Sequence, residues 1–214
     1  MMSRTALVLC ITVAPMLAAA DNLAFRVTDA ASGAPLSEAV IVLPLAATEA
    51  DTDARMVQQN RQFVPHVMVV PPGTDVAFPN RDNTQHHVYS FSPARTFEIE
   101  LYAGVPEAPV RFGNTGVVEL GCNIHDRMQG FILVTDQRHG MTDDQGRLTL
   151  EWPDDQPRPE QVRVWHPRLT DNTALVVVTL PGSTGNPATI TLDVRPAPDT
   201  DDSLQRLQQR FREL

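Results

Sequence analysis

The chain has little cysteine, no lysine and no excess of positive charge. Its 214 residues include two cysteines, 17 basic residues that are all arginine, and 26 acidic residues, for a formal net charge of −9. This acidic balance makes nucleic acid and anionic membranes poor partners. The negative charge would favour binding to a basic protein partner. Alternatively, it only keeps the protein in solution. The bias toward arginine indicates no function.

Long apolar runs are absent beyond the first residues. Arg4 precedes a mostly apolar stretch over residues 6–17, and the alanines at 18–20 offer small residues for cleavage. This pattern predicts a signal peptide at 1–20, and the apolar stretch is too short to span a bilayer. We therefore expect an exported, periplasmic protein without a membrane span.

Export would leave a single cysteine. Cys10 is lost with the signal peptide, so Cys122 is the remaining cysteine of the expected mature chain. An intramolecular disulfide is then excluded, and so is the dinuclear copper centre of respiratory oxidases, which needs two cysteines in one loop. A lone cysteine in an exported protein is a free thiol, half of an intermolecular disulfide, or a metal thiolate.

The residues around Cys122 favour the metal thiolate. Cys122, His125 and Met128 follow one another at a C-x-x-H-x-x-M spacing in the run GCNIHDRM. Two imidazoles, a thiolate and a long axial thioether are the ligands of a soft mononuclear copper site. The second imidazole must come from an earlier strand, and the pair His86 and His87 supplies it. Successive side chains of a strand face opposite sides, so only one of the two can reach a buried metal.

Sequence motifs of common enzymes are absent. The chain contains no H-E-x-x-H, no glycine-rich phosphate loop and no G-x-S-x-G. Oxidases and nitrite reductases with a second copper centre need several further histidines, whereas His66, His139 and His166 have the sequence surroundings of surface or packing residues. We therefore expect a protein that is not an enzyme.

Short segments rich in Val, Ile, Thr and Phe alternate with turn signals along most of the chain. Pro-Pro-Gly at 71–73, Asp-Gln-Gly at 144–146 and Pro-Gly-Ser at 181–183 are examples of the turns. The pattern predicts an all-β protein built as an antiparallel sandwich. The expected strands cover residues 23–28, 39–45, 67–70, 75–78, 87–91, 96–101, 116–120, 131–135, 147–152, 161–165, 174–180 and 188–194.

The C-terminal end has a different pattern. After a polar linker rich in proline and aspartate, Leu204, Leu207, Phe211 and Leu214 fall on one side of a helix. We expect a short amphipathic helix within residues 200–214. Its apolar stripe would pack on the protein's own sandwich, or mediate self-association or docking to a partner.

Residues 54–136 resemble the cupredoxins, the plastocyanin- and amicyanin-like family of small blue copper proteins. The resemblance rests on the run VVPPGTDVAF at 69–78, on Asn80 followed six residues later by His86, and on the C-x-x-H-x-x-M loop. It implies a Greek-key β-sandwich with one type 1 copper ion.

The resemblance also implies the ligand set, which consists of His86, Cys122, His125 and Met128. The family usually has asparagine directly after the first ligand. In this chain His87 occupies that position, so it is the competing candidate ligand.

The whole chain resembles exported bacterial methylamine utilization and plastocyanin-like proteins. Its marks are HHVYSFS at 86–92, LGCNIHD at 120–126 and VWHP at 164–167. The flanks, 22–53 and 137–196, look like one transthyretin-like (carboxypeptidase regulatory-like) β-sandwich into which the cupredoxin domain is inserted. Alternatively, the first flank belongs to the copper domain.

The resemblance predicts a periplasmic carrier of single electrons. Bound copper would change oxidation state, electrons would pass through the exposed edge of His125, and a basic redox protein such as a c-type cytochrome would be the partner. The alternatives are a copper chaperone or storage protein, and a module that joins an assembly without redox activity.

Overall fold

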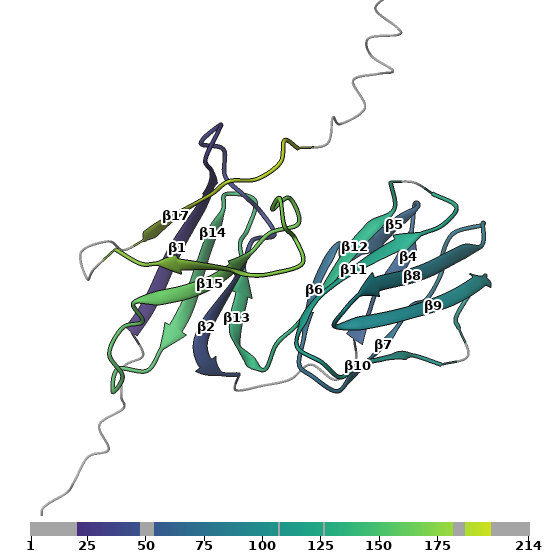
Figure 1. Cartoon of the computed structure of the whole chain (residues 1–214), viewed down its shortest axis with the longest axis horizontal. Helices are drawn as coiled ribbons and strands as arrows, with labels where there is room; N and C mark the ends of the chain where they lie inside the picture. The colour runs from purple at the N-terminus through teal and green to yellow at the C-terminus, as the bar shows by residue number, and fades with distance from the viewer. Residues whose placement is uncertain (1–20, 48–53, 107, 126, 182–186, 198–214) are drawn as a thin grey trace, which may run out of the picture.

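The computed structural model describes residues 21–47, 54–106, 108–125, 127–181 and 187–197 (Figure 1). All regular elements in these ranges are strands, and no helix occurs among them, which confirms the expected all-β class. Within the same ranges, no helix has the length and apolarity of a membrane span. The expected signal peptide (1–20) and C-terminal helix (200–214) lie outside the described residues.

The first and last strands of the described chain form one sandwich, which we call the flanking sandwich. Its strands are β1 (Asp21–Asp29), β2 (Val40–Ala46), β13 (Gln137–Met141), β14 (Arg147–Trp152), β15 (Gln161–Trp165), β16 (Val176–Thr179) and β17 (Ala188–Leu192). They make a three-stranded sheet, β14-β1-β17, and a four-stranded sheet, β13-β2-β15-β16. The N-terminal flank therefore pairs with the C-terminal strands and not with the strands around Cys122 (Figure 1).

The intervening strands pair among themselves, and we call them the central sandwich. They are β3 (Ala54–Arg55), β4 (Val57–Gln59), β5 (Gln62–Val64), β6 (Val67–Val70), β7 (Thr74–Ala77), β8 (His86–Ser92), β9 (Arg95–Tyr102), β10 (Val110–Phe112), β11 (Gly116–Cys122) and β12 (Gln129–Val134). They form a five-stranded sheet, β6-β12-β11-β8-β9, a three-stranded sheet, β10-β7-β3, and the two-stranded hairpin β4-β5.

Burial alternates along strands that have only one face on the core. In β1, Leu23, Phe25 and Val27 are buried while Arg26 between them is exposed, as expected for a strand with one face on the core. The apolar run at the start of β2 is buried at every position, because its side chains share a buried cluster with residues of β1 and of the central sandwich. Apolar area buried in this way is the main favourable contribution to folding.

Most strand pairs in the described ranges are antiparallel, as expected, but three of the five sheets there also contain a parallel pair. β1 pairs with β17, β6 with β12, and β3 with β7 in parallel register. Parallel strands are not connected by a hairpin turn, so a local turn signal in the sequence cannot predict that they pair. Five strands, β3, β4, β5, β10 and β13, were also not predicted, since most are too short for an alternating pattern and their pairing partners define them.

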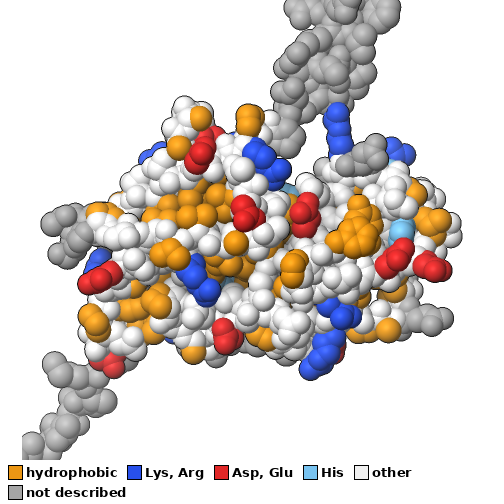
Figure 2. All heavy atoms as spheres, viewed as in Figure 1, with side chains coloured by type: hydrophobic (Ala, Val, Ile, Leu, Met, Phe, Trp, Pro, Cys, Tyr) orange, Lys and Arg blue, Asp and Glu red, His pale blue; other side chains and the backbone are white. Residues whose placement is uncertain are grey.

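The two sandwiches meet in one buried hydrophobic cluster, and the central sandwich has a second buried cluster of its own. Phe131 of β12 contacts Trp165 of β15, and Val67 and Leu133 belong to the same buried cluster as the residues of β2. On the face shown in Figure 2, charged side chains of both signs are interspersed, and apolar side chains gather over the flanking sandwich at the left. The flanking sandwich thus supports β12, the strand that follows the Cys122 loop.

Candidate metal centre

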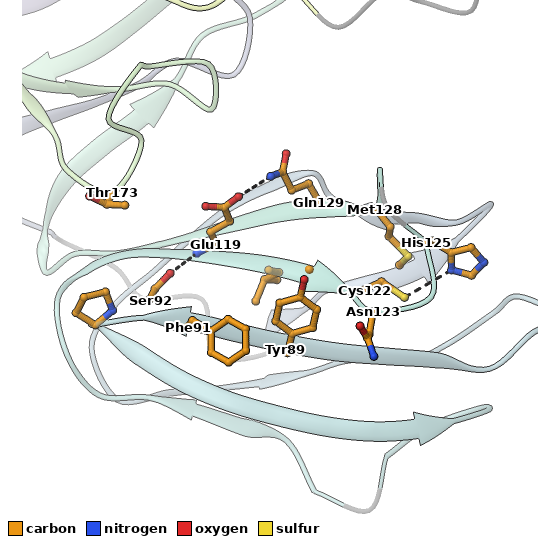
Figure 3. Close-up of a pocket in the computed structure, with 13 residues that line it drawn as sticks. Tyr89, Phe91, Ser92, Glu119, Cys122, Asn123, His125, Met128, Gln129 and Thr173 are labelled. Carbon is orange, nitrogen blue, oxygen red and sulfur yellow. Dashed lines mark hydrogen bonds between the residues drawn. The ribbon is translucent and has the colours of Figure 1, made fainter.

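The loop between β11 and β12 brings Cys122, His125 and Met128 to one end of a pocket of about 540 Å³. Cys122 ends β11, and the backbone amides of His125 and Met128 donate to the carbonyls of Cys122 and His125 at 3.4 and 2.9 Å. These two tight turns fold the loop back, so the three side chains gather (Figure 3). Cys122 and Met128 are buried, and His125 is half-buried.

Strand β8 lies directly beside Cys122. Gly121 pairs with Tyr89 and Cys122 with Val88 in antiparallel register. The Tyr89 ring packs so closely on Gly121 that a Cβ atom there would lie 2.6 Å from the ring carbon Cζ. Glycine at this position therefore lets β8 approach β11. Because side chains alternate along a strand, His86 faces the same side of β8 as the buried Val88.

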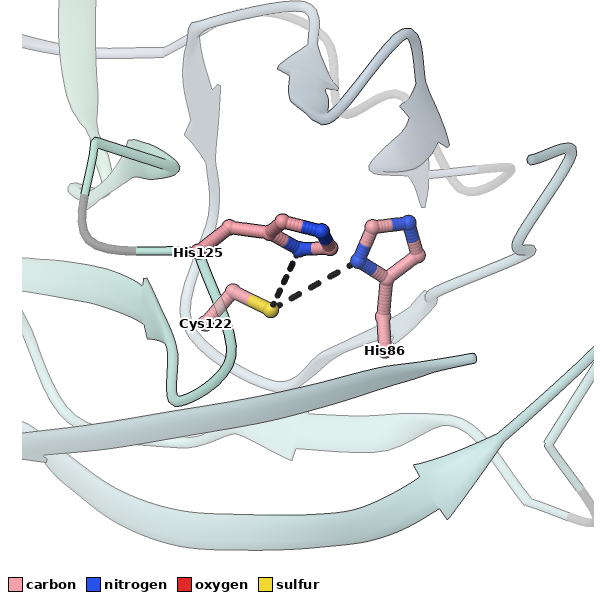
Figure 4. Close-up of side chains that lie close together, drawn as sticks. All are labelled: His86, Cys122 and His125. Atoms are coloured by element: carbon pink, nitrogen blue, oxygen red, sulfur yellow. Dashed lines mark hydrogen bonds between the residues drawn. The ribbon is translucent and has the colours of Figure 1, made fainter. Parts of the chain in front are cut away.

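His86, Cys122 and His125 form a compact group of metal-ligating atoms (Figure 4). The Sγ atom of Cys122 lies 3.5 Å from Nδ1 of His86 and 3.5 Å from Nδ1 of His125. The two imidazole rings have their centroids 4.9 Å apart, and the three ligating atoms all lie within 4.8 Å of one another. His86 and Cys122, which are 36 residues apart in the sequence, therefore belong to the same site.

His87, the competing candidate, does not join this group. Its Nε2 atom lies 2.7 Å from a carboxylate oxygen of Glu98 on the neighbouring strand β9, and its ring centroid lies 6.1 Å from that of Tyr89. These contacts are on the outer face of β8, opposite the face that carries His86. The geometry brings His86, and not His87, to the Cys122 loop.

Asp82 contacts the far side of His86, a role that the sequence did not suggest. Its Oδ2 atom accepts a hydrogen bond of 2.8 Å from Nε2 of His86. Burial alone would raise the pKa of Asp82, but hydrogen bonds from the Arg61 amide, His86 and the Asn60 amide outweigh it and hold that pKa below its usual value. In the sequence Asp82 is one polar residue within a polar loop, so no local signal marked it.

The surroundings of His125 favour its neutral state, which is the state that binds a metal. Burial lowers its pKa, and the nearby His86 and Arg61 act in the same direction. A neutral imidazole at ordinary pH keeps a nitrogen lone pair for coordination.

The donor set fits copper. One cysteine sulfur and two imidazole nitrogens converge, and the thioether-bearing Met128 lines the same pocket. Thiolate and thioether are soft ligands that suit copper in both oxidation states, whereas structural zinc sites use Cys and His and rarely Met. Of the predicted donors, His86, Cys122 and His125 lie within one cluster, with Met128 beside it.

Comparison with known proteins gives matches among solved structures only. No protein family model and no curated protein matches the chain. A purple cupredoxin from Nitrosopumilus maritimus is 21% identical and covers 39% of this chain and 100% of its own, with a TM-score of 0.35. A reduced amicyanin variant is 18% identical over 44% of this chain and 98% of its own, with a TM-score of 0.34.

A Cu-containing nitrite reductase from Thermus scotoductus also matches. It is 21% identical over 44% of this chain but only 25% of its own length, with a TM-score of 0.37. These proteins are cupredoxins or copper proteins to which part of the chain is similar. Because the identities and TM-scores are low, we base the metal assignment on the side chains themselves.

Proposed function

We propose that this chain is a periplasmic copper protein with a single type 1 centre that carries one electron at a time between redox partners. The observation that supports this most directly is the convergence of two Nδ1 atoms on one buried cysteine sulfur, each at 3.5 Å. The fold itself brings these three ligating atoms within 4.8 Å of one another. Copper, when bound, supplies a one-electron couple between Cu(II) and Cu(I).

The protein's own residues would carry out three tasks. Cys122 would bind as thiolate, His86 and His125 would bind through Nδ1, and Met128 would supply a thioether. Burial of His86, at 0% exposure, and of Cys122, at 5%, excludes water from that side and restrains the ligands. A site that hardly rearranges between oxidation states has a low barrier to electron transfer, so rigid ligands favour a carrier.

His125 is the proposed point of electron entry and exit. It is half-buried and lies on a loop beside Ile124, whose side chain is 46% exposed. An apolar side chain next to a partly exposed ligand suits a small, transient contact with a redox partner. The net charge of −9 favours a basic partner, for which a c-type cytochrome is our proposal.

The flanking sandwich is proposed to be transthyretin-like and to serve as an interaction module rather than a second active site. Self-association through residues 200–214 is part of the same proposal. The expected signal peptide and the single thiol of the expected mature chain support a periplasmic location. We propose no enzymatic activity for either sandwich.

Copper loading tests the proposal. The purified metal-free protein, titrated with Cu(II), should bind one equivalent and develop an intense blue thiolate-to-copper absorption. Cys122→Ser should lose the colour, whereas His139→Ala, a histidine of β13 in the flanking sandwich, should retain it. A wild-type copper complex without the blue absorption would refute thiolate ligation.

A second measurement separates a carrier from a copper chaperone or store. A carrier should show reversible one-electron voltammetry, fast self-exchange and slow loss of copper to a chelator. A chaperone should show sluggish redox chemistry and rapid transfer of copper to an acceptor protein. The buried positions of His86 and Cys122 favour retention of the metal, and therefore the carrier.

A further inference from the structure

The buried ring of His86 is held from both sides. Its Nδ1 atom lies 3.5 Å from the sulfur of Cys122, and its Nε2 atom lies 2.8 Å from Oδ2 of Asp82. An ionised carboxylate can only accept hydrogen bonds. Nε2 must therefore carry a proton, and in the neutral ring this leaves Nδ1 with a free lone pair on the side of Cys122.

Asp82 is itself held by the turn of the β4-β5 hairpin. The backbone amides of Asn60 and Arg61 donate to Oδ1 and Oδ2 of Asp82 at 2.6 and 2.9 Å. Both turn residues have left-handed backbone conformations, with φ of 56° and 59°, which favour a two-residue hairpin turn. This conformation is strained for a non-glycine residue, and it turns both amides toward one carboxylate.

A third contact fixes the backbone of Asp82. Its amide donates to Oδ1 of Asn80 at 2.9 Å, and the Asn80 side chain in turn donates to the carbonyls of Thr84 and Tyr102. The loop that leads into β8 is therefore tied to the hairpin and to β9. Asp82 is only 13% exposed at its side chain, so solvent screens its charge weakly.

We propose that Asp82, anchored by the Asn60-Arg61 turn, is a positioning residue that fixes the tautomer and ring orientation of His86 before metal binds and stabilises the oxidised form of the loaded site. A carboxylate behind an imidazole ligand increases the basicity of that ligand. The additional negative charge favours Cu(II) over Cu(I). This inference rests on the proposed copper function, although its first consequence exists in the metal-free protein.

The metal-free protein provides the first test. Nitrogen-15 NMR of the His86 ring should show the Nε2–H tautomer in the wild type and a mixture of tautomers in Asp82→Ala. A wild-type ring protonated at Nδ1 instead would overturn the inference, whether or not any variant folds. This readout does not depend on copper, so it remains informative even if the proposed function fails.

The loaded protein provides the second test. Asp82→Asn keeps the shape of the side chain and removes its charge, so Cu(II) affinity should fall about 10- to 100-fold while Cu(I) affinity falls less. The reduction potential should therefore rise. Asp75→Asn, which removes an exposed carboxylate of the same sandwich, should change neither quantity.

A further variant separates positioning from loop stability. Asn60→Gly keeps the amide donor and relieves the left-handed backbone, so it should leave the affinities and the potential unchanged. A folded Asp82→Asn protein with wild-type affinities and potential would show that Asp82 only anchors the loop. If the wild type shows no blue absorption at all, the proposed function fails, and the tautomer measurement still decides the inference.

Discussion

The ring of Phe131 meets the indole of Trp165 edge-on, with ring centroids 5.2 Å apart and an angle of 60° between the planes. Phe131 belongs to β12 of the central sandwich, and Trp165 belongs to β15 of the flanking sandwich. Each ring is at most 1% exposed. β12 begins directly after Met128, so the same contact that joins the sandwiches also supports the metal loop.

Removing this contact should destabilise the protein strongly. Phe131→Ala would leave a cavity between the sandwiches and should lower the free energy of unfolding by about 3–5 kcal/mol. Denaturant unfolding followed by tryptophan fluorescence measures this. Phe91→Ala is the matched control, because Phe91 is 81% exposed and its loss should change stability by less than about 0.5 kcal/mol. Equal losses for both variants would contradict a shared core.

The two adjacent histidines of β8 should behave differently. His86→Ala removes a buried ring beside Cys122, so the blue copper absorption should disappear or be replaced by a weaker spectrum. His87→Ala removes a ring that contacts Glu98 on the outer face, so the absorption should persist with similar intensity. Titration of both variants with Cu(II) checks this. Loss of colour in His87→Ala alone would reverse the assignment.

Gly121 should tolerate no side chain. A Cβ atom would lie 2.6 Å from the Tyr89 ring, so Gly121→Ala should lower the free energy of unfolding by about 1–3 kcal/mol. Gly113→Ala is the control, since nothing lies within 4 Å of a Cβ atom there. The double variant Gly121→Ala with Tyr89→Ala should recover part of the loss, and a double-mutant cycle measures this coupling. Purely additive effects would argue against the clash.

His166 should make the metal-free protein less stable in mild acid. Burial lowers its pKa from 6.5 to about 4, and the positive charge of Arg168 acts in the same direction. Between these two pH values the unfolded state binds more protons than the folded state. Stability is therefore greatest above pH 6.5 and should fall by about 3 kcal/mol as the pH is lowered to 4.

A glutamine at this position tests the effect. The Nε2 atom of His166 donates to the Ser37 carbonyl at 3.1 Å, and Nδ1 accepts from the Arg168 amide at 3.1 Å. His166→Gln can make both kinds of hydrogen bond but does not titrate, so its stability should decline less between these pH values. An identical pH dependence in the variant would show that His166 is not the source of the acid sensitivity.

Much of the sheet structure could be predicted from the sequence, because long strands carry their own signal. The segments 67–70, 147–152 and 161–165 were predicted with the bounds that the structure has. The short strands β3, β4 and β5 were not, because segments of two or three residues have too little pattern to distinguish them from turns. Parallel pairings such as β6 with β12 were missed because they depend on contacts between distant segments.

Some features of the candidate site could be predicted from the sequence, and others depend on the fold. The spacing of Cys122, His125 and Met128 in one loop is a local property, and it predicted that these side chains gather. The choice between His86 and His87 is not local, since it depends on the register of β8 against β11. The contact between Asp82 and His86 was also missed, because only the folded loop reveals which polar side chain points inward.

By itself, the sequence determined the all-β class, the soft donor atoms and their order along the Cys122 loop, because these depend on residue type and short spacings. The tertiary structure alone decided which face of β8 meets Cys122, which carboxylate supports His86, and that the two sandwiches share a core at Phe131 and Trp165. These features join residues far apart in the chain. Such contacts depend on strand register and on the side toward which each side chain points, and a sequence pattern of short range does not specify either.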